Sequence, residues 1–335
     1  MLRFVLRRIF LILPVLIGLT VIMFVIARVL PGDPVALAAG PNATRDEIAR
    51  YAQEFGLDRP IWVQYWSYLT GLMQGDFGVS IFTRRPVATD LATYLPATLE
   101  LVFAAMMLAI AIGIPAGLMA AVWRNRWPDY TSNVLSVAAI SMPRFFLGLL
   151  LQLCFAMWLM WLPLGGRFPI IYEPPPFVTG FYTLDALFAG DWESFVVACR
   201  YLALPAIAMS LSPLATILRM MRASTIEVLH QDYVTTARAL GLSPRLIVFK
   251  YVLRNAISSS LTVIGLYFGW LLGGTVLVET VFDWPGIGLY ATSAIVAQDF
   301  MPVVSVALVI GFLFICANIV IDVLYGLINP KVRYQ

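Results

Sequence analysis

Charged residues are scarce in this chain of 335 residues: Asp, Glu, Lys and Arg make up 12% of it, and 61% is hydrophobic. A soluble domain carries roughly a quarter charged residues, so the composition excludes an ordinary soluble domain and indicates an integral membrane protein. The net charge of +3 is too small to predict nucleic-acid binding.

Residues that bind metals or form disulfides are also few. The single histidine, His230, has no second ligand near it in the sequence, which argues against a metal site. Cys154, Cys199 and Cys316 lie in or at the edge of apolar runs without CxxC spacing. This pattern predicts three small buried hydrophobic side chains.

Sequence motifs for nucleotide binding and hydrolysis are missing. Lys250 and Lys331 are the only lysines, and neither follows a glycine or precedes Ser or Thr, as a Walker A lysine does. GxSxG, HExxH and paired carboxylates inside apolar runs are absent as well. We therefore expect no enzyme activity, no metal site and no cofactor bound by this chain. If its activity needs energy, the source must be another subunit or an ion gradient.

Long apolar runs dominate what is present. A bilayer core requires about 20 apolar residues per helix. Six spans are predicted: Ile9–Ala27, Leu101–Trp123, Thr131–Trp161, Tyr201–Leu218, Ala256–Val278 and Met301–Ile321. The third is predicted as one long helix broken or kinked at Pro143, because proline removes a backbone donor. The first is long enough to be a retained span and not a cleaved signal.

Basic residues predict the orientation of these spans, since Arg and Lys collect in cytoplasmic loops. If the N-terminus is inside, 13 of the 22 basic residues lie in inner segments, and outer segments hold Arg45, Arg50, Arg59, Arg84, Arg85 and Arg167. The last outer loop, Thr280–Phe300, has none. Both termini are therefore predicted to be cytoplasmic.

Residues 31–100 form an outer segment too long for a simple turn. A helix is predicted from the capping box at Thr44 to Gly56, and another after Pro60. The aromatic face of the second helix fits either a membrane surface or packing on a neighbouring span. In the loop after the third span, three prolines and several acids predict a solvated connector, which could also contact a partner.

One basic segment near residues 219–256 has the signals of a helix-turn-helix. Ile226, Leu229, Tyr233, Ala237 and Leu240 have helical spacing and predict one amphipathic helix. Gly241 then suits a left-handed C′ position, and Ser243 and Pro244 suit N-cap and N1 of the next helix. A solvated loop needs neither caps nor an apolar stripe, so a protruding docking helix is favoured.

The same segment resembles the EAA loop of permease subunits in bacterial ATP-binding-cassette (ABC) importers, more narrowly the peptide/nickel branch and its first, dipeptide-type permease. Further landmarks, in the family's order, are LPGDP, GDFGVS, YLPATLEL, ALPAIAMSLSP, ETVFDWPGIG and LYGLINPKVRY. The resemblance covers essentially the whole chain. It implies an all-α polytopic fold of the MetI-like permease type with six transmembrane helices and both termini inside.

Matching the family's E-A-A-x-x-x-G pattern to Gly241 puts Thr235, Thr236 and Ala237 under E-A-A, so the glutamate and first alanine are replaced. Thr-Ala-Arg-Ala is a familiar variant of the peptide branch. The resemblance therefore implies a coupling helix around Tyr233–Leu240, which includes Arg238 and fits a groove of an ATPase subunit.

The resemblance also implies the chain's partners and location. We expect a second, similar permease, two ATPase subunits that bind ATP and Mg, a periplasmic binding protein, and the inner membrane of a bacterium. The chain divides into residues 1–30 with the first span, the outer segment 31–100, and the core 101–335. Peptides are the expected cargo; nickel complexes, glutathione and opine-like solutes are alternatives.

Two further sets of residues are candidates for the transport path. Arg144, next to Pro143, is a charge deep in a span and could pair with a cargo carboxylate, although snorkelling or pairing with another span is an alternative. In the loop Asp283–Gly288, Trp284, Pro285, Gly286 and Gly288 have turn chemistry and are assigned to the outer gate or to a purely structural role.

A gradient-driven secondary transporter or channel is the alternative of another class. Such proteins usually show internal repeats and acids inside their spans. The sequence shows no repeat, and its acids Glu100, Glu279 and Asp322 fall at the ends of predicted spans, where capping or interfacial roles are expected.

Overall fold

The computed structural model describes residues 2–29, 44, 53 and 59–328, with side chains at 13–26 of the first helix and up to 321 and at 323 of the last. Helices account for nearly all of its regular structure, and within these residues the one β contact is an isolated bridge between Val79 and Pro86. The expected outer helix from Thr44 to Gly56 falls largely outside the described residues.

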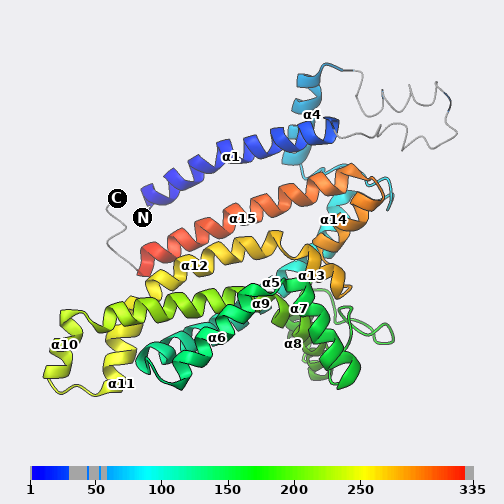
Figure 1. Cartoon of the computed structure of the whole chain (residues 1–335). Coiled ribbons are helices and arrows are strands. Elements are labelled where there is room, and N and C mark those ends of the chain that lie inside the picture. The colour runs from blue at the N-terminus through cyan, green and yellow to red at the C-terminus, as the bar shows by residue number, and fades with distance from the viewer. Residues whose placement is uncertain (1, 30–43, 45–52, 54–58, 329–335) are drawn as a thin grey trace.

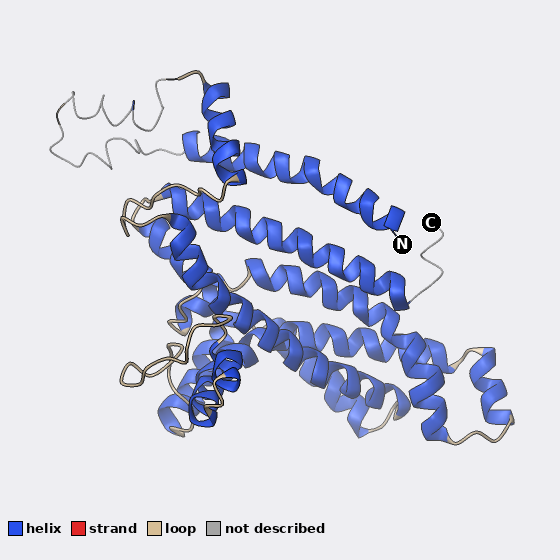
Figure 2. Cartoon of the chain, turned by 180° about the vertical axis from the view of Figure 1, so that it is seen from behind, coloured by secondary structure: helices blue, strands red, loops and turns tan. Residues whose placement is uncertain are grey.

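Five long helices run roughly alongside one another through the molecule (Figures 1 and 2). They are α1 (Leu2–Val29), α5 (Val87–Val122), α9 (Trp192–Leu229), α12 (Leu253–Gly273) and α15 (Phe300–Ile328). Short helices occupy the two ends. They are α4 (Ile61–Met73), α8 (Tyr182–Phe188), α13 (Val276–Val281) and α14 (Ile287–Val296) at one end, and α10 (Asp232–Ala239) and α11 (Pro244–Leu246) at the other.

Four described helical segments are long and apolar enough to cross a membrane: Val87–Val122, Trp192–Leu229, Pro244–Gly273 and Phe300–Ile321. They correspond to four of the predicted spans. The end predicted for the fifth span, Val278, is wrong. The helix stops at Gly273, and α13 follows as a separate helix. Helix α1 covers the first predicted span, with Leu13–Ile26 as its apolar described part.

The break predicted at Pro143 in the third span is confirmed, and the two halves form a sharply bent pair. Helix α6 (Trp127–Ser141) and the segment made of α7 (Arg144–Leu151) and the π-helical turn η1 (Gln152–Trp158) meet at 106°. Pro143 is the N-cap of α7, and Met142 and Pro143 both have extended backbone. Because a residue before proline avoids the helical region, the chain can turn fully at this point.

The core lies between α5 and α9, which pack against each other along much of their length. Helix α12 covers one side of this pair. Glycine allows the closest approach: a Cβ at Gly117 of α5 would lie 2.5 Å from the carbonyl oxygen of Leu218 and 2.8 Å from Cβ of Met221, both on α9. Small residues permit such contact between membrane helices, whose association rests on packing.

Helix α4 packs on α1 by one edge, and its residues are otherwise partly or fully exposed. Tyr65 shares a 2.9 Å hydrogen bond with Thr20 and an edge-to-face contact with Phe24. Trp62 and Trp66 are 71% and 64% exposed. Packing on a neighbouring long helix is therefore confirmed for this aromatic helix, and its place at a membrane surface stays a prediction. The prediction of three buried cysteines is wrong: Cys199 is exposed, and Cys154 and Cys316 are partly exposed.

Candidate functional site

A compact knob, defined as α10, the turn 240–243 and α11, projects at the end where α1 starts and α15 finishes (Figure 1). Gly241 has φ +71°, the left-handed conformation expected of a helix-terminating glycine. The Ser243 hydroxyl accepts a bond from Leu246 N at 3.4 Å, and Pro244 opens α11. These caps are confirmed, and α11 continues through η2 (Ile247–Val252) into α12.

The single amphipathic helix expected across Arg222–Leu240 is wrong. Helix α9 ends at Leu229, His230 and Gln231 interrupt it, and α10 begins at Asp232. The break changes which face is buried: Val234 and Ala237 pack against Ile247 and Val252, whereas Leu240 is 74% exposed. The knob is therefore packed on η2 through a small apolar cluster that the two share.

The expected coupling residues lie on both sides of α10. Tyr233, Thr235, Thr236 and Arg238 are exposed, as is Gly241. Ala237 is 4% exposed and contributes to the packing of the knob. Arg238 lines a hollow of about 400 Å³ that extends to Val122 at the end of α5. The tyrosine hydroxyl of Tyr233 accepts a bond from Asn255 Nδ2 at 3.1 Å, which ties the knob to α12.

An ion pair joins the bent pair to α9 near the same end. Arg222 of α9 donates two hydrogen bonds to Asp129 of α6, at 2.5 and 2.9 Å. Asp129 also accepts bonds from Asn125 N and Asn133 Nδ2. The sequence analysis assigned Arg222 only to an inner loop. The pairing with Asp129 could not be predicted, because Asp129 lies 93 residues earlier and no local pattern links the two.

At the opposite end, the loop Asp283–Gly288 encloses a buried carboxylate. Glu279 is fully buried; its Oε1 accepts from Thr98 Oγ1 at 2.7 Å and its Oε2 from Leu289 N at 2.9 Å. A side chain at Gly286 or Gly288 would collide with Glu279. Burial raises the pKa of Glu279, although the bond from Thr98 opposes the shift. Of the two roles expected for Glu279, the bond from Leu289 N in the first turn of α14 (Ile287–Val296) fits capping.

Trp284 fixes the same loop to α5. Its ring is 1% exposed, and its Nε1 donates to Ala97 O at 2.9 Å. Asp283 is exposed and has φ +49°, and Phe282 O accepts a 2.7 Å bond from Gly166 N. Pro285 lines a nearby cavity with Leu289 and Tyr290. The loop is therefore packed on the start of α5 along most of its length.

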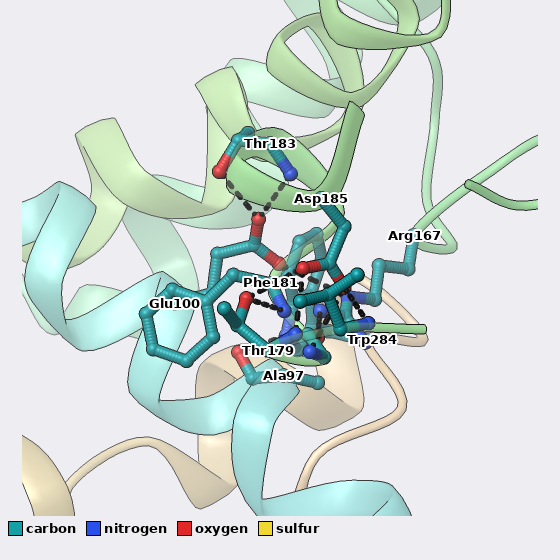
Figure 3. A network of polar contacts seen from close by, with 10 residues as sticks. Ala97, Glu100, Arg167, Thr179, Phe181, Thr183, Asp185 and Trp284 are labelled. Carbon is teal, nitrogen blue, oxygen red and sulfur yellow. Dashed lines mark hydrogen bonds and ion pairs between the residues drawn. The ribbon is translucent and has the colours of Figure 1, made fainter. Parts of the chain in front are cut away.

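A second buried network orders the Pro-rich loop (Figure 3). Arg167 pairs with Glu100 at 2.6 Å, stacks on Tyr182 at 3.8 Å from the ring centroid and donates to Gly180 O at 2.5 Å. Glu100 also accepts two bonds from Thr183. Glu100 is 3% exposed, and its bond from Thr183 N, in the first turn of α8, fits the capping role that was one of the two expected for it.

Asp185 corrects the expectation of a solvated connector. It is 1% exposed and accepts from the backbone N–H groups of Val178, Thr179 and Gly180. Burial alone would raise the pKa of its carboxyl, but the hydrogen bonds outweigh burial and hold the pKa below the usual value. The bonds to Asp185 thus anchor one side of the loop, while Ile170 and Ile171 remain almost fully exposed.

Arg144 lies half-buried at the start of α7, directly after the bend at Pro143. A Cβ added to Gly274 would lie 2.8 Å from one of its guanidinium nitrogens, so the charged group reaches the end of α12. Among the described residues, ion pairs join Arg167 to Glu100 and Arg222 to Asp129, and neither includes Arg144. Pairing with another span is therefore not seen in this part of the chain.

Comparison with known proteins places the chain in a family. The model for the binding-protein-dependent transport system inner membrane component matches residues 113–334, and the model for the N-terminal part of such membrane components matches residues 1–102. The chain belongs to this family. It is accordingly a membrane component of a transport system and not an enzyme.

Curated relatives match over their full length or nearly so. The probable D,D-dipeptide transport system permease protein of Escherichia coli is 45% identical over 318 residues, which cover 95% of this chain and 94% of that protein. The di/tripeptide transport system permease protein of Pseudomonas aeruginosa is 44% identical over 336 residues, with both chains fully covered. A glutathione transport system permease protein of Escherichia coli is 39% identical over 335 residues, also with full coverage.

Proposed function

We propose that this chain is one of two permease subunits that together form the translocation path of an ATP-driven importer of short peptides. The peptide cargo is favoured because di- and tripeptide permeases are its relatives at 44–45% identity, against 39% for a glutathione permease. Nickel complexes, glutathione and opine-like solutes are alternative cargoes. A periplasmic binding protein delivers the cargo to the end that carries α4, α8, α13 and α14.

The observation that carries the proposal is the knob. It is held by Gly241, by the Ser243 cap and by an apolar cluster shared with η2, and it still presents Tyr233, Arg238 and Leu240 outward. A segment that only connected two spans would need no such rigidity. The knob therefore fits a socket on a soluble ATPase subunit, which holds the ATP and Mg.

The knob also suits transmission of force. Helix α11 continues through η2 into α12, and α9 ends two residues before α10. A rigid-body push on the knob thus acts directly on two of the long helices. Alternating access would follow if the two ATPase subunits close on ATP and the bundle has two packed arrangements.

The orientation follows from the same assignment. The start of α1 and the finish of α15 lie at the knob end (Figure 1). If the knob meets a cytoplasmic ATPase, both termini are cytoplasmic, and α1, the four long segments and the bent pair make six spans in a bacterial inner membrane. The excess of basic residues at this end agrees with that orientation.

The test uses liposomes that contain both permeases and both ATPase subunits, with ATP inside and binding protein outside. A labelled dipeptide should accumulate only when ATP and the ATPase subunits are present, and an uncoupler should leave the uptake unchanged. Uptake that persists without the ATPase subunits and collapses with the uncoupler would show a gradient-driven transporter instead.

A further inference from the structure

A cavity of about 240 Å³ lies between the segment before α5, helix α14 and the start of α15. Its lining includes the oxygen-bearing residues Ser80, Thr83, Tyr290 and Asp299. Leu289 and Pro302 are among the apolar residues that line it. No expectation from the sequence and no step of the proposed transport role makes use of this cavity.

Asp299 is the feature that points to a ligand. The residue is 1% exposed, and its Oδ2 accepts bonds from Ser80 Oγ at 2.6 Å and from Phe82 N at 3.0 Å. Its Oδ1 is buried, and no group of the described residues donates to it. A buried carboxylate oxygen without a donor is unfavourable by about 1–3 kcal/mol or more, so a donor from outside the chain would be bound favourably.

A second carboxylate stands directly behind the cavity wall. Asp90 is 4% exposed, and its Oδ2 accepts from Thr83 Oγ1 and Tyr290 Oη, both at 2.8 Å. Neither Asp90 nor Asp299 takes part in an ion pair with a basic residue in the part of the chain that the structure describes. The cavity wall thus carries two negative charges that this part of the chain leaves uncompensated.

The kind of cation follows from the walls. Calcium takes six or more oxygen ligands, and the described residues contain no cluster of three or more Asp, Glu, His or Cys that could hold a metal. Tyr94 and Tyr290 stack with ring centroids 5.0 Å apart at this cavity. Aromatic and aliphatic walls favour a cation that carries carbon, since it gains cation–π and apolar contacts together.

We propose that this cavity binds a primary ammonium group attached to a carbon chain. Its N–H groups would donate to the Asp299 carboxylate, whose Oδ1 would become available as the side chain turns towards the cavity, and its methylene groups would lie against Tyr94 and the apolar walls. The ammonium group can come from the α-amino end of a peptide or from an alkylamine. Binding requires neither ATP nor partner subunits, so its failure and a failure of the transport role are separate results.

Equilibrium dialysis of labelled n-butylammonium against the purified full-length chain tests this binding. Binding should saturate at one amine per chain, with about nine-tenths of the sites filled at about ten times the dissociation constant. Glu193→Gln, which removes an exposed acid elsewhere, is the control and should bind the amine equally.

Other probes separate the chemistries by competition with labelled n-butylammonium. Tetramethylammonium lacks N–H donors and should compete poorly. Alanyl-alanine should compete if an α-amino group fits, and N-acetyl-alanyl-alanine should not. Equal competition by unlabelled butylammonium and tetramethylammonium, competition by Ca²⁺ alone, or no saturable binding of any amine would each overturn the proposal.

A variant provides a second, independent measurement. In Asp299→Asn the neutral amide cannot pair with an ammonium group, so n-butylammonium should no longer raise the thermal unfolding midpoint, as it does in the parent chain. Glu193→Gln is the matched control and should keep the full shift. If Asp299→Asn keeps the shift, the site is wrong.

Discussion

Thr98 on α5 donates a 2.7 Å hydrogen bond to the buried carboxylate of Glu279 on α13, 181 residues further along the chain. The Thr98 hydroxyl oxygen also accepts from Ile287 N at 2.9 Å. Trp284, next to these groups, donates to the backbone of Ala97. The short helices α13 and α14 are thereby fixed to the first turns of α5, which makes this end a single packed unit.

Glu279→Gln should change how stability depends on pH. The pKa of Glu279 is raised in the folded chain, so its contribution is fully present below the ordinary value of 4.5 and is lost as pH rises through the higher folded value. The amide does not titrate, so the unfolding midpoint of the variant should fall less than that of the parent chain over this range. Thermal unfolding in detergent at several pH values measures it. Equal slopes for Glu279→Gln and the parent would contradict the assignment, and Glu193→Gln is the control.

Arg167→Met should destabilise the chain by about 3–5 kcal/mol, because it leaves Glu100 charged and buried without its cation. The double variant Glu100→Leu/Arg167→Met should lose less than the single one, since no buried charge remains. Unfolding by denaturant in detergent measures both. Arg85→Met, at an exposed position of the same end, is the control, and a loss no larger than that of this control would show that the pair is unimportant.

Gly117→Ala should destabilise the chain by about 1–3 kcal/mol, because the added methyl group would press on Leu218 O and Met221 where α5 crosses α9. Gly18→Ala is the matched control, as a Cβ there has nothing within 4 Å. Unfolding midpoints of the two variants give the comparison. If Gly117→Ala is as stable as Gly18→Ala, the two helices are not in the described contact.

Arg144→Gln should reduce the preference for cargo with a free carboxylate. The half-buried guanidinium forms no ion pair with a described residue, so a carboxylate arriving along the path would be its partner. The measurement is KM for a dipeptide and for its C-terminal amide. The KM of the amide divided by the KM of the dipeptide should fall towards one in Arg144→Gln and stay high in Arg144→Lys. An unchanged ratio in Arg144→Gln would remove Arg144 from the path.

Local signals were predictable from the sequence, and contacts between distant residues were not. Gly241, Ser243 and Pro244 were identified correctly because helix caps depend on a few neighbouring residues. The break at His230 was missed because apolar residues keep helical spacing on both sides of it. The knob therefore buries a different face of α10 from the one predicted.

The same limit applies to the buried acids. Glu100 and Glu279 follow or precede apolar runs, a position typical of a span end, yet each bonds to a side chain far away along the chain, Arg167 and Thr98 respectively. Pro143 correctly predicted a break in the third span. The angle between α6 and α7 was not predictable, because it depends on how the two helices pack on the rest of the bundle. Spacing along the chain contains no information on such partners.

We propose the knob as the contact through which ATP hydrolysis drives transport. The most direct test of this role is Arg238→Glu in the reconstituted transporter, with dipeptide uptake, ATP hydrolysis and co-purification of the ATPase subunits measured together. The substitution lies at an exposed position, so folding should be unaffected, while uptake should be lost and the ATPase subunits should co-purify weakly. Arg59→Glu, an equal charge change at the opposite end, should leave co-purification unchanged. Normal uptake and normal co-purification in Arg238→Glu would contradict the account.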